Sequence, residues 1–278
     1  MPDAGIAALM IVAGVAVGTF GSLVGLGGGV LLVPVLTLGF GLPLREAVGV
    51  SLVAVIVTSS ASAAVYLERH VADLRLGMTL ELFTASGALI GGLVAFALSE
   101  QVLAALFTAM LVYTALSMAR RRDAASTTVS AAASDIASAP SAAAPGTGVG
   151  DPGRPYVVRN LGLGIVGSLF AGLVSALLGV GGGVVKVPLM HLAMGVPLRV
   201  ATATSNLMIG ITGAASAIIY LLHGGIDPFV AGPTSVGVFI GASIGSRSAH
   251  RVDVRILRLL FVGVLLVTAS QMAGRALR

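Results

Sequence analysis

The sequence contains no cysteine, and only 10% of its residues are charged. Without cysteine there can be no disulfide, no thiol nucleophile and no thiolate ligand for a metal. A soluble domain of average composition carries about 25% charged residues, so the low charge counts against a soluble globular protein. Four histidines are scattered along the chain and form no convergent cluster. The sequence therefore predicts no enzyme, no metal site and no bound cofactor.

Long apolar runs dominate what is present. The chain is 56% hydrophobic with a mean hydropathy of +1.04, and the runs 47–67, 77–98 and 259–272 approach the roughly 20 residues that span a bilayer. Basic residues stand at the ends of such runs, as membrane topology places them, so the high isoelectric point does not indicate nucleic acid. No Lys or Arg precedes the run 4–24, which we expect to be a retained span. We predict an all-α, multi-pass membrane protein in contact with lipid.

The apolar runs form five segments on each side of a polar stretch. The second segment of each half is short, contains a proline and is bounded by glycines, whereas the other four are long enough to span. Asp73 and Asp227 precede the fourth segments and suit helix N-caps. The predicted segments are 4–24, 28–41, 46–67, 76–98 and 101–119, then 157–179, 182–195, 200–222, 228–246 and 255–273.

A polar stretch at 120–156 divides the two halves. It begins with three arginines and continues mainly in Ala, Ser, Thr, Pro and Gly, with almost no large apolar side chains. Such a composition cannot bury enough surface to offset chain entropy. We therefore predict a first membrane repeat at 1–119, a flexible cytosolic linker at 120–156 that is poorly ordered over 124–150, and a second membrane repeat at 157–278.

The two halves repeat each other. Residues 21–66 align without a gap with residues 175–220, and 20 of the 46 positions are identical. A repeat with a short Gly/Pro-broken segment in each half points to a transporter and to its binding site. If each short segment crosses the membrane, 12 arginines lie inside against three outside; if neither crosses, nine basic residues lie inside against six. The positive-inside rule favours the first arrangement, in which five crossings invert the second half and both termini lie outside.

Each short segment follows a glycine cluster. The clusters lack the Gly-Lys-Ser/Thr ending and the strand context of a nucleotide-binding loop. Close helix packing through small residues and a helix break near the membrane centre are both open readings. In the second reading, the exposed backbone N–H groups of the two breaks meet and bind an anion. The glycines concerned are Gly27, Gly28, Gly29, Gly181, Gly182 and Gly183.

The duplicated Gly-x-Gly-Gly-Gly-x-x-x-x-Pro pattern, followed by Gly-x-Pro and a Ser/Thr-rich helix, resembles the TauE/SafE sulfite exporter family. The resemblance covers essentially the whole chain apart from the linker. It implies a bacterial inner-membrane transporter that exports sulfite, a related small sulfur-containing anion or an organosulfonate. The motif is specific to the family and does not specify one substrate.

Two ionisable side chains lie within apolar segments. Lys186, the only lysine, follows the second glycine triplet where the first half has Leu32. A buried ammonium by default marks function, the alternative being a side chain that snorkels to the interface. We predict that Lys186 binds the anion. Glu81 either carries a coupling proton or, as we prefer, joins an ion pair at the cytosolic interface.

Hydroxyl side chains recur at equal spacing in the two halves and fall on one helical stripe. They line a path, or else they bond back to the backbone and pack; the pattern does not decide. Arg45 and Arg199 begin the third segments and attract anions or, as we prefer, anchor helix ends. We predict that Lys186, Ser205 and Asn206 lie near the substrate with Ser51 opposite. The predicted pathway residues are Arg45, Thr58, Ser62, Arg199, Thr212 and Ser216.

These features together predict a secondary transporter that exports sulfite or a related small sulfur-containing anion or organosulfonate. An anion channel, or a carrier for another small anion, is the alternative. An inside-negative potential favours exit of an anion by about 2.3 kcal/mol per charge per 100 mV. The sequence decides neither proton coupling nor oligomeric state.

Overall fold

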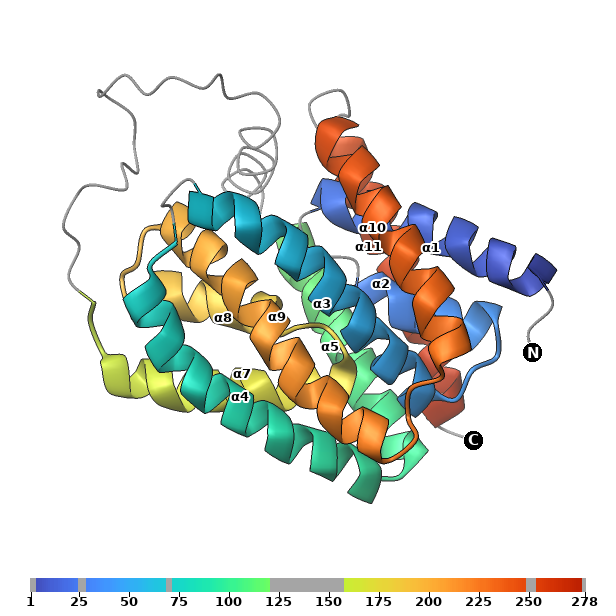
Figure 1. The fold of residues 1–278 in the computed structure, drawn as a ribbon, viewed down its shortest axis with the longest axis horizontal. Helices are drawn as coiled ribbons and strands as arrows, with labels where there is room; N and C mark the ends of the chain where they lie inside the picture. Colours follow the sequence, from blue (N-terminus) through green and yellow to red (C-terminus); the bar gives the residue numbers. More distant parts are fainter. Residues whose placement is uncertain (1–3, 25–28, 69–71, 121–157, 249–253, 277–278) are drawn as a thin grey trace.

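The computed structural model describes residues 4–24, 29–68, 72–120, 158–248 and 254–276 (Figure 1). These ranges contain helices and no strand, so the predicted all-α fold class is confirmed for the described part of the chain. The predicted linker at 124–150 and the glycines Gly27 and Gly28 lie outside the described residues.

The described helices follow the order of the predicted segments. Their ends lie within four residues of the predicted ends, except that α2 and α8 end seven residues before the predicted ends at 41 and 195. In the first half they are α1 (Ala4–Val24), α2 (Gly29–Pro34), α3 (Leu44–Glu68), α4 (Leu74–Ala97) and α5 (Glu100–Arg120). In the second half they are α7 (Leu161–Leu178), α8 (Gly183–Pro188), α9 (Leu198–Leu222), α10 (Pro228–Ser248) and α11 (Val254–Ala276).

The short segment of each half has the same two-part form. Helix α2 continues as a π-helical turn, η1 (Val35–Gly39), and α8 continues as η2 (Leu189–Ala193). In each case a proline directly precedes the π turn, and proline lacks the N–H that would continue the α-helical ladder. Gly41 and its repeat equivalent Gly195 then turn the chain with φ of 72°, which glycine adopts without a steric penalty.

The fourth helices begin at the predicted aspartates. A carboxylate oxygen of Asp73 accepts a hydrogen bond from the N–H of Leu76 at 3.0 Å, which caps α4. At the start of α10 the carboxylate of Asp227 accepts from the N–H of Phe229 at 2.9 Å. Both bonds satisfy donors that a helix N-terminus leaves unpaired.

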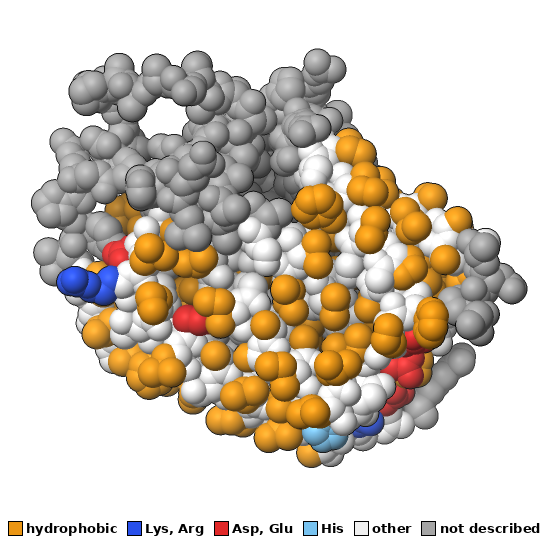
Figure 2. Space-filling model, viewed as in Figure 1, with side chains coloured by type: hydrophobic (Ala, Val, Ile, Leu, Met, Phe, Trp, Pro, Cys, Tyr) orange, Lys and Arg blue, Asp and Glu red, His pale blue; other side chains and the backbone are white. Residues whose placement is uncertain are grey.

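Four of the described helices are long and apolar enough to cross a membrane: Leu74–Ala97, Leu161–Leu178, Val200–Leu222 and Pro228–Gly245. Shorter apolar helices accompany them. Figure 2 shows hydrophobic side chains spread over the described surface of this face, with few charged ones among them. Met78 and Leu222, for example, are 70% and 75% exposed. Extensive apolar surface of this kind marks contact with lipid or with another protein.

The main contacts between helices follow the repeat: a helix pair that packs closely has a repeat-equivalent pair that also packs together. Helix α4 packs against α7, and their repeat equivalents α10 and α1 pack against each other; α3 packs against α9, and α5 against α11. A Cβ atom on Gly172 would overlap the carbonyl oxygen of Thr84, and one on Gly18, its repeat equivalent, would overlap the carbonyl oxygen of Val238. Residues 84 and 238 are themselves repeat equivalents. The glycines therefore permit the same close backbone approach at two places in the fold.

Candidate functional site

The helix break of the second half lies between α7 and α8. Gly179, Gly181 and Gly182 have φ of 68°, 77° and 73°, values that side chains with a Cβ rarely adopt. These angles end α7 and redirect the chain into α8. Unwound backbone of this kind is tolerated at membrane depth only where protein or a cavity surrounds it.

The two glycine clusters meet at Ser51 of α3. The Ser51 hydroxyl lies 2.7 Å from the carbonyl oxygen of Gly179 and 3.2 Å from that of Gly29, so both oxygens compete for its single hydrogen. A Cβ atom on Gly29 would lie 2.9 Å from the Gly179 oxygen. The structure thus brings Ser51, Gly29 and Gly179 together. Gly179 was not among the predicted substrate-binding glycines.

Lys186 extends from α8 back past the second glycine cluster. A Cβ atom on Gly182 would lie 3.4 Å from Cε of Lys186, because side chains on a helix point toward its N-terminus. The Nζ atom donates to the Thr212 hydroxyl at 2.6 Å and lies 3.4 Å from Oε2 of Glu81. Lys186 is 1% exposed and Glu81 is 4% exposed. The ammonium is therefore buried and does not snorkel to a surface.

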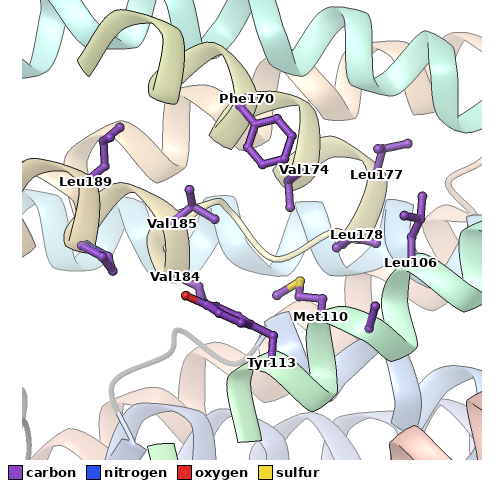
Figure 3. A pocket seen from close by; sticks show the side chains of 12 residues that line it. Leu106, Met110, Tyr113, Phe170, Val174, Leu177, Leu178, Val184, Val185 and Leu189 are labelled. Carbon is purple, nitrogen blue, oxygen red and sulfur yellow. The ribbon is translucent and has the colours of Figure 1, made fainter. Parts of the chain in front are cut away.

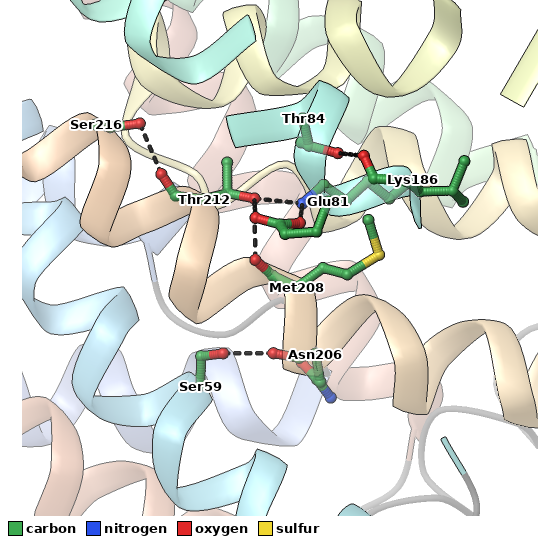
Figure 4. A network of polar contacts seen from close by, with 9 residues as sticks. Ser59, Glu81, Thr84, Lys186, Asn206, Met208, Thr212 and Ser216 are labelled. Atoms are coloured by element: carbon green, nitrogen blue, oxygen red, sulfur yellow. Dashed lines mark hydrogen bonds and ion pairs between the residues drawn. The ribbon is translucent and has the colours of Figure 1, made fainter. Parts of the chain in front are cut away.

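Glu81 is the ion-pair partner of Lys186, a pairing that the sequence did not predict. We expected Glu81 to pair at a cytosolic interface, yet it pairs with Lys186 inside the protein (Figure 4). Helices α4 and α8 are far apart in sequence, and only the packing of α4 and α8 around α9 brings the two charges together. Within the described residues this is the one ion pair found.

Thr212 of α9 bridges the pair. Its hydroxyl accepts from Lys186 and can donate its hydrogen either to Oε1 of Glu81 at 2.7 Å or to the carbonyl oxygen of Met208 at 2.9 Å. Figure 4 shows the three polar groups converging from three elements. Thr212, one of the predicted pathway residues, thus contacts both charged groups.

Two other predicted pathway hydroxyls bond within their own helices. Ser216 donates to the carbonyl oxygen of Thr212 at 3.0 Å, and Thr58 lies 3.1 Å from the carbonyl oxygens of both Ala54 and Val55. Such bonds correspond to the packing alternative. The side chains of Ser62 and Arg199 lie outside the described residues.

Buried hydroxyls without a partner surround the second break. Ser205 is 1% exposed, and its Oγ has no hydrogen-bond partner in the described structure. It lies 3.7 Å from where a Cβ of Gly183 would be. The Oγ of Ser175 in α7 is likewise unpartnered, and its Cβ lies 3.2 Å from the corresponding position at Gly182. An unpaired buried hydroxyl is costly, and a bound polar ligand would remove that cost.

Arg45 occupies a structural position, and the backbone of Asn206 links two helices. The backbone carbonyl oxygen of Asn206 accepts a hydrogen bond from the Ser59 hydroxyl, which ties α9 to α3 without using the Asn206 side-chain amide. The Arg45 guanidinium donates to the carbonyl oxygens of Ala95, at 3.2 Å, and Leu98. These carbonyls end α4, where a cation is favoured, and Arg45 therefore anchors a helix end as preferred above.

The charged cluster has no counterpart in the other half. The repeat equivalents of Lys186 and Glu81 are Leu32 and Ser235, whereas Thr212 corresponds to Thr58. Leu32 is buried in the hydrophobic core, and the Ser235 hydroxyl is buried without a partner among the described residues. Both charges are absent together, so the pair behaves as one feature of the second half.

A separate apolar pocket of about 600 Å³ lies between α5, α7 and the α8–η2 segment (Figure 3). Met110, Tyr113, Phe170 and Val184 are among the side chains that line it, and Lys186, Glu81 and Thr212 are not. It offers an anion almost no hydrogen-bond donors. Within the described residues no group of His, Asp or Glu could hold a metal ion.

Short proline-containing segments in both halves, with a buried ion pair beside the second glycine break, are features expected of a membrane transporter. The sequence matches the family "Sulfite exporter TauE/SafE" over residues 10–272. The chain therefore belongs to the TauE/SafE sulfite exporter family and is a multi-pass membrane transporter.

Curated relatives agree with this class. "Probable membrane transporter protein YunE" of Bacillus subtilis is 25% identical over 272 residues, which cover 95% of this chain and 96% of that protein. "Probable membrane transporter protein MamO" of Magnetospirillum gryphiswaldense is 26% identical over 134 residues, which cover 45% of this chain and 20% of that protein. No solved structure matches the chain.

Proposed function

We propose that this protein is a secondary transporter that exports sulfite, a related small sulfur-containing anion or an organosulfonate across the bacterial inner membrane. The observation that carries the proposal is the buried Lys186 ammonium beside the second glycine break, with Thr212 at 2.6 Å and the unpartnered Ser205 nearby. The family to which the chain belongs supports the choice of a sulfur oxyanion.

The chemistry of the site suits a small oxyanion. An anion that leaves water loses strong hydrogen bonds, and burial is tolerable only if a cation and donors replace them. Lys186 supplies a charge and up to three N–H donors, and hydroxyls such as Ser205 and Ser175 supply further donors. Sulfite and the sulfonate group each present three oxygens that can accept such bonds.

An inverted repeat would give this site access from both sides in turn. We infer that residues 1–119 and 157–278 insert in opposite orientations, joined by a cytosolic linker at 120–156. The packing of α4 against α7 recurs as the packing of α10 against α1, their repeat equivalents. This recurrence, together with the matching glycine contacts, supports a two-fold relation between the halves. With five crossings in each half the axis would lie in the membrane plane, and rocking of one repeat against the other would alternate access.

A flux assay in liposomes tests the proposed function. Purified protein would be reconstituted and offered sulfite, thiosulfate, sulfate, an organosulfonate or chloride. We expect saturable flux of sulfite or the sulfonate that exceeds the flux of chloride. Saturable turnover without single-channel conductance identifies a carrier, whereas discrete conductance steps identify an anion channel. Absence of flux for every sulfur anion would contradict the proposal.

A charge-neutral variant locates the site in the same assay. The double substitution Lys186→Met with Glu81→Gln removes both charges and leaves no buried charge unpaired. We expect this variant to insert normally and to lose sulfur-anion flux. Ser86→Ala is the matched control, because Ser86 is exposed on α4 and its hydroxyl bonds only within its own helix, to Leu82. Unchanged flux in the double variant would remove Lys186 from the mechanism.

A further inference from the structure

We propose that Glu81 occupies the place of the transported anion at Lys186 in the empty transporter, so that each anion is carried together with one proton on Glu81. This inference rests on the proposed function, because it assumes that the substrate anion binds at the Lys186 ammonium. It adds the coupling ion, which neither the sequence nor the family assigns.

The buried Lys186 ammonium can neutralise only one full negative charge. The ammonium already faces Glu81 at 3.4 Å and Thr212 at 2.6 Å, and all three side chains are buried. A second anion at this ammonium would place two negative charges beside one positive charge in a poorly solvated site. Such an excess charge is costly. Protonation of Glu81 as the anion arrives keeps the site neutral.

No other described group can balance the extra charge. Helix α7, which packs against α4, has no ionisable residue between Leu161 and Leu178, and the described side chains of α9 contain only Tyr220, whose hydroxyl donates to the carbonyl oxygen of Ala176. His191 of η2 is exposed and contacts the carbonyl oxygen of Val196. Lys186 is therefore the one described cation that faces Glu81.

The proton balance follows directly. On the side where the anion enters, a proton passes from water to the Glu81 carboxylate, which releases Lys186 to the anion. On the opposite side the anion leaves, the proton returns to water and the Lys186–Glu81 pair forms again. For a monovalent anion the site has zero net charge in the empty and in the loaded transporter. The membrane potential then exerts no force on transport. Export follows the anion's own concentration gradient, and a pH difference draws the anion toward the more alkaline side.

The asymmetry of the two halves fixes the stoichiometry. Because Leu32 and Ser235 replace Lys186 and Glu81 in the first half, the chain carries one such pair. One pair takes one anion and one proton in each cycle. The first half lacks both charges and not just one of them. This is expected if each charge compensates the other.

The test measures accumulation of radiolabelled ethanesulfonate in liposomes, because this sulfonate stays a monoanion at all working pH values. Any proton that moves with it must then be carried by the protein. A potassium diffusion potential or a pH difference is imposed, and the equilibrium ratio of inside to outside label is recorded. For the wild type we expect no accumulation at 100 mV and tenfold accumulation for one pH unit, toward the more alkaline compartment.

Glu81→Gln reverses these expectations. Gln has the shape of a protonated Glu81, so the loaded transporter is unchanged and tracer exchange of ethanesulfonate should persist. The empty transporter now has an unpaired charge, so net transport moves charge: a potential of 100 mV should drive up to about 50-fold accumulation, and a pH difference should drive none.

The possible failures are distinct. Wild-type accumulation that follows the potential and ignores pH would overturn proton coupling and leave the proposed function intact. A wild-type protein that moves neither ethanesulfonate nor sulfite would overturn both. A Glu81→Gln variant that still accumulates label in response to pH, or that is folded but exchanges no label, would overturn the role of Glu81.

Discussion

The Nζ atom of Lys186 lies 2.6 Å from the hydroxyl oxygen of Thr212, closer than the 3.4 Å that separates it from the Glu81 carboxylate. Thr212 in turn lies 2.7 Å from the other carboxylate oxygen. The hydroxyl thus mediates much of the contact between two buried charges. Thr212, a neutral residue on a third helix, lies within hydrogen-bond distance of both members of the ion pair.

Thr212→Val should destabilise the protein, because it keeps the side-chain shape and removes the bridge. The loss of a buried hydrogen bond to a charged group costs about 1.5–3 kcal/mol. The unfolding temperature in detergent should therefore fall. Thr212→Ser, which keeps the hydroxyl, is the matched control and should remain closer to the wild type. Equal unfolding temperatures for wild type and Thr212→Val would show that the bridge contributes nothing.

Ser205→Ala should reduce transport without reducing stability. The Ser205 hydroxyl is buried and unpartnered in the described structure, so its removal relieves a penalty of about 1–3 kcal/mol at most and cannot break a bond. If the hydroxyl instead contacts the substrate, sulfite flux should fall and its half-saturation concentration should rise. Flux and unfolding temperature would be measured on the same preparation.

The control for Ser205→Ala is Ser59→Ala. Ser59 donates to the carbonyl oxygen of Asn206 and ties α3 to α9, so its loss should lower the unfolding temperature. A Ser205→Ala variant that is less stable, yet transports normally, would show that Ser205 packs the helices and does not bind substrate.

Gly172→Ala should loosen the contact between α7 and α4. A Cβ atom there would overlap the carbonyl oxygen of Thr84, and overpacking of this kind costs about 1–3 kcal/mol. Gly162→Ala on the same helix is the control, because no heavy atom lies within 4 Å of its Cβ position. Alanine there, in the first turn of α7, should leave the unfolding temperature unchanged or slightly raised. Equal unfolding temperatures for the two variants would contradict the close packing.

Much of the helix layout follows from the sequence, because span length and helix stops are local properties. Apolar runs of about 20 residues define spans, and Pro34 and Pro188 interrupt the short segments. Asp73 caps α4 as predicted, through a bond to a residue three positions away. The choice of packing partner is not a local property of a helix. The contact between α4 and α7, for example, depends on glycines whose role becomes visible only when the partner helix is known.

Only those residues of the candidate site that have a local sequence signal could be expected from the sequence. Lys186 stands out because it is the only lysine and lies in an apolar segment. Its pairing with Glu81 joins residues 105 positions apart, and no spacing rule connects them. The repeat offers a signal that could have linked them: at both positions the first half has an uncharged residue, Leu32 and Ser235. The bridging role of Thr212 had no signal beyond its place on a hydroxyl stripe.

The absence of cysteine allows a direct test of the inverted repeat. Pro43 and Pro197 are repeat equivalents that follow the turns at Gly41 and Gly195, and neither is fully buried. The arginine count predicts that residue 43 lies outside the cell and residue 197 inside. A single cysteine introduced at either position would be the only thiol in the protein, so the wild type serves as an unlabelled background.

Opposite insertion of the halves predicts opposite labelling of these two variants. A membrane-impermeant maleimide should modify Pro43→Cys in intact cells, and should modify Pro197→Cys only after the membrane is permeabilised. Labelling of both after permeabilisation is the control for thiol access, since a cysteine hidden by the fold would stay unmodified in either condition. If both variants label from the same side, equivalent turns lie on one face of the membrane. The halves would then be parallel, and alternating access by an inverted repeat would be wrong for this protein.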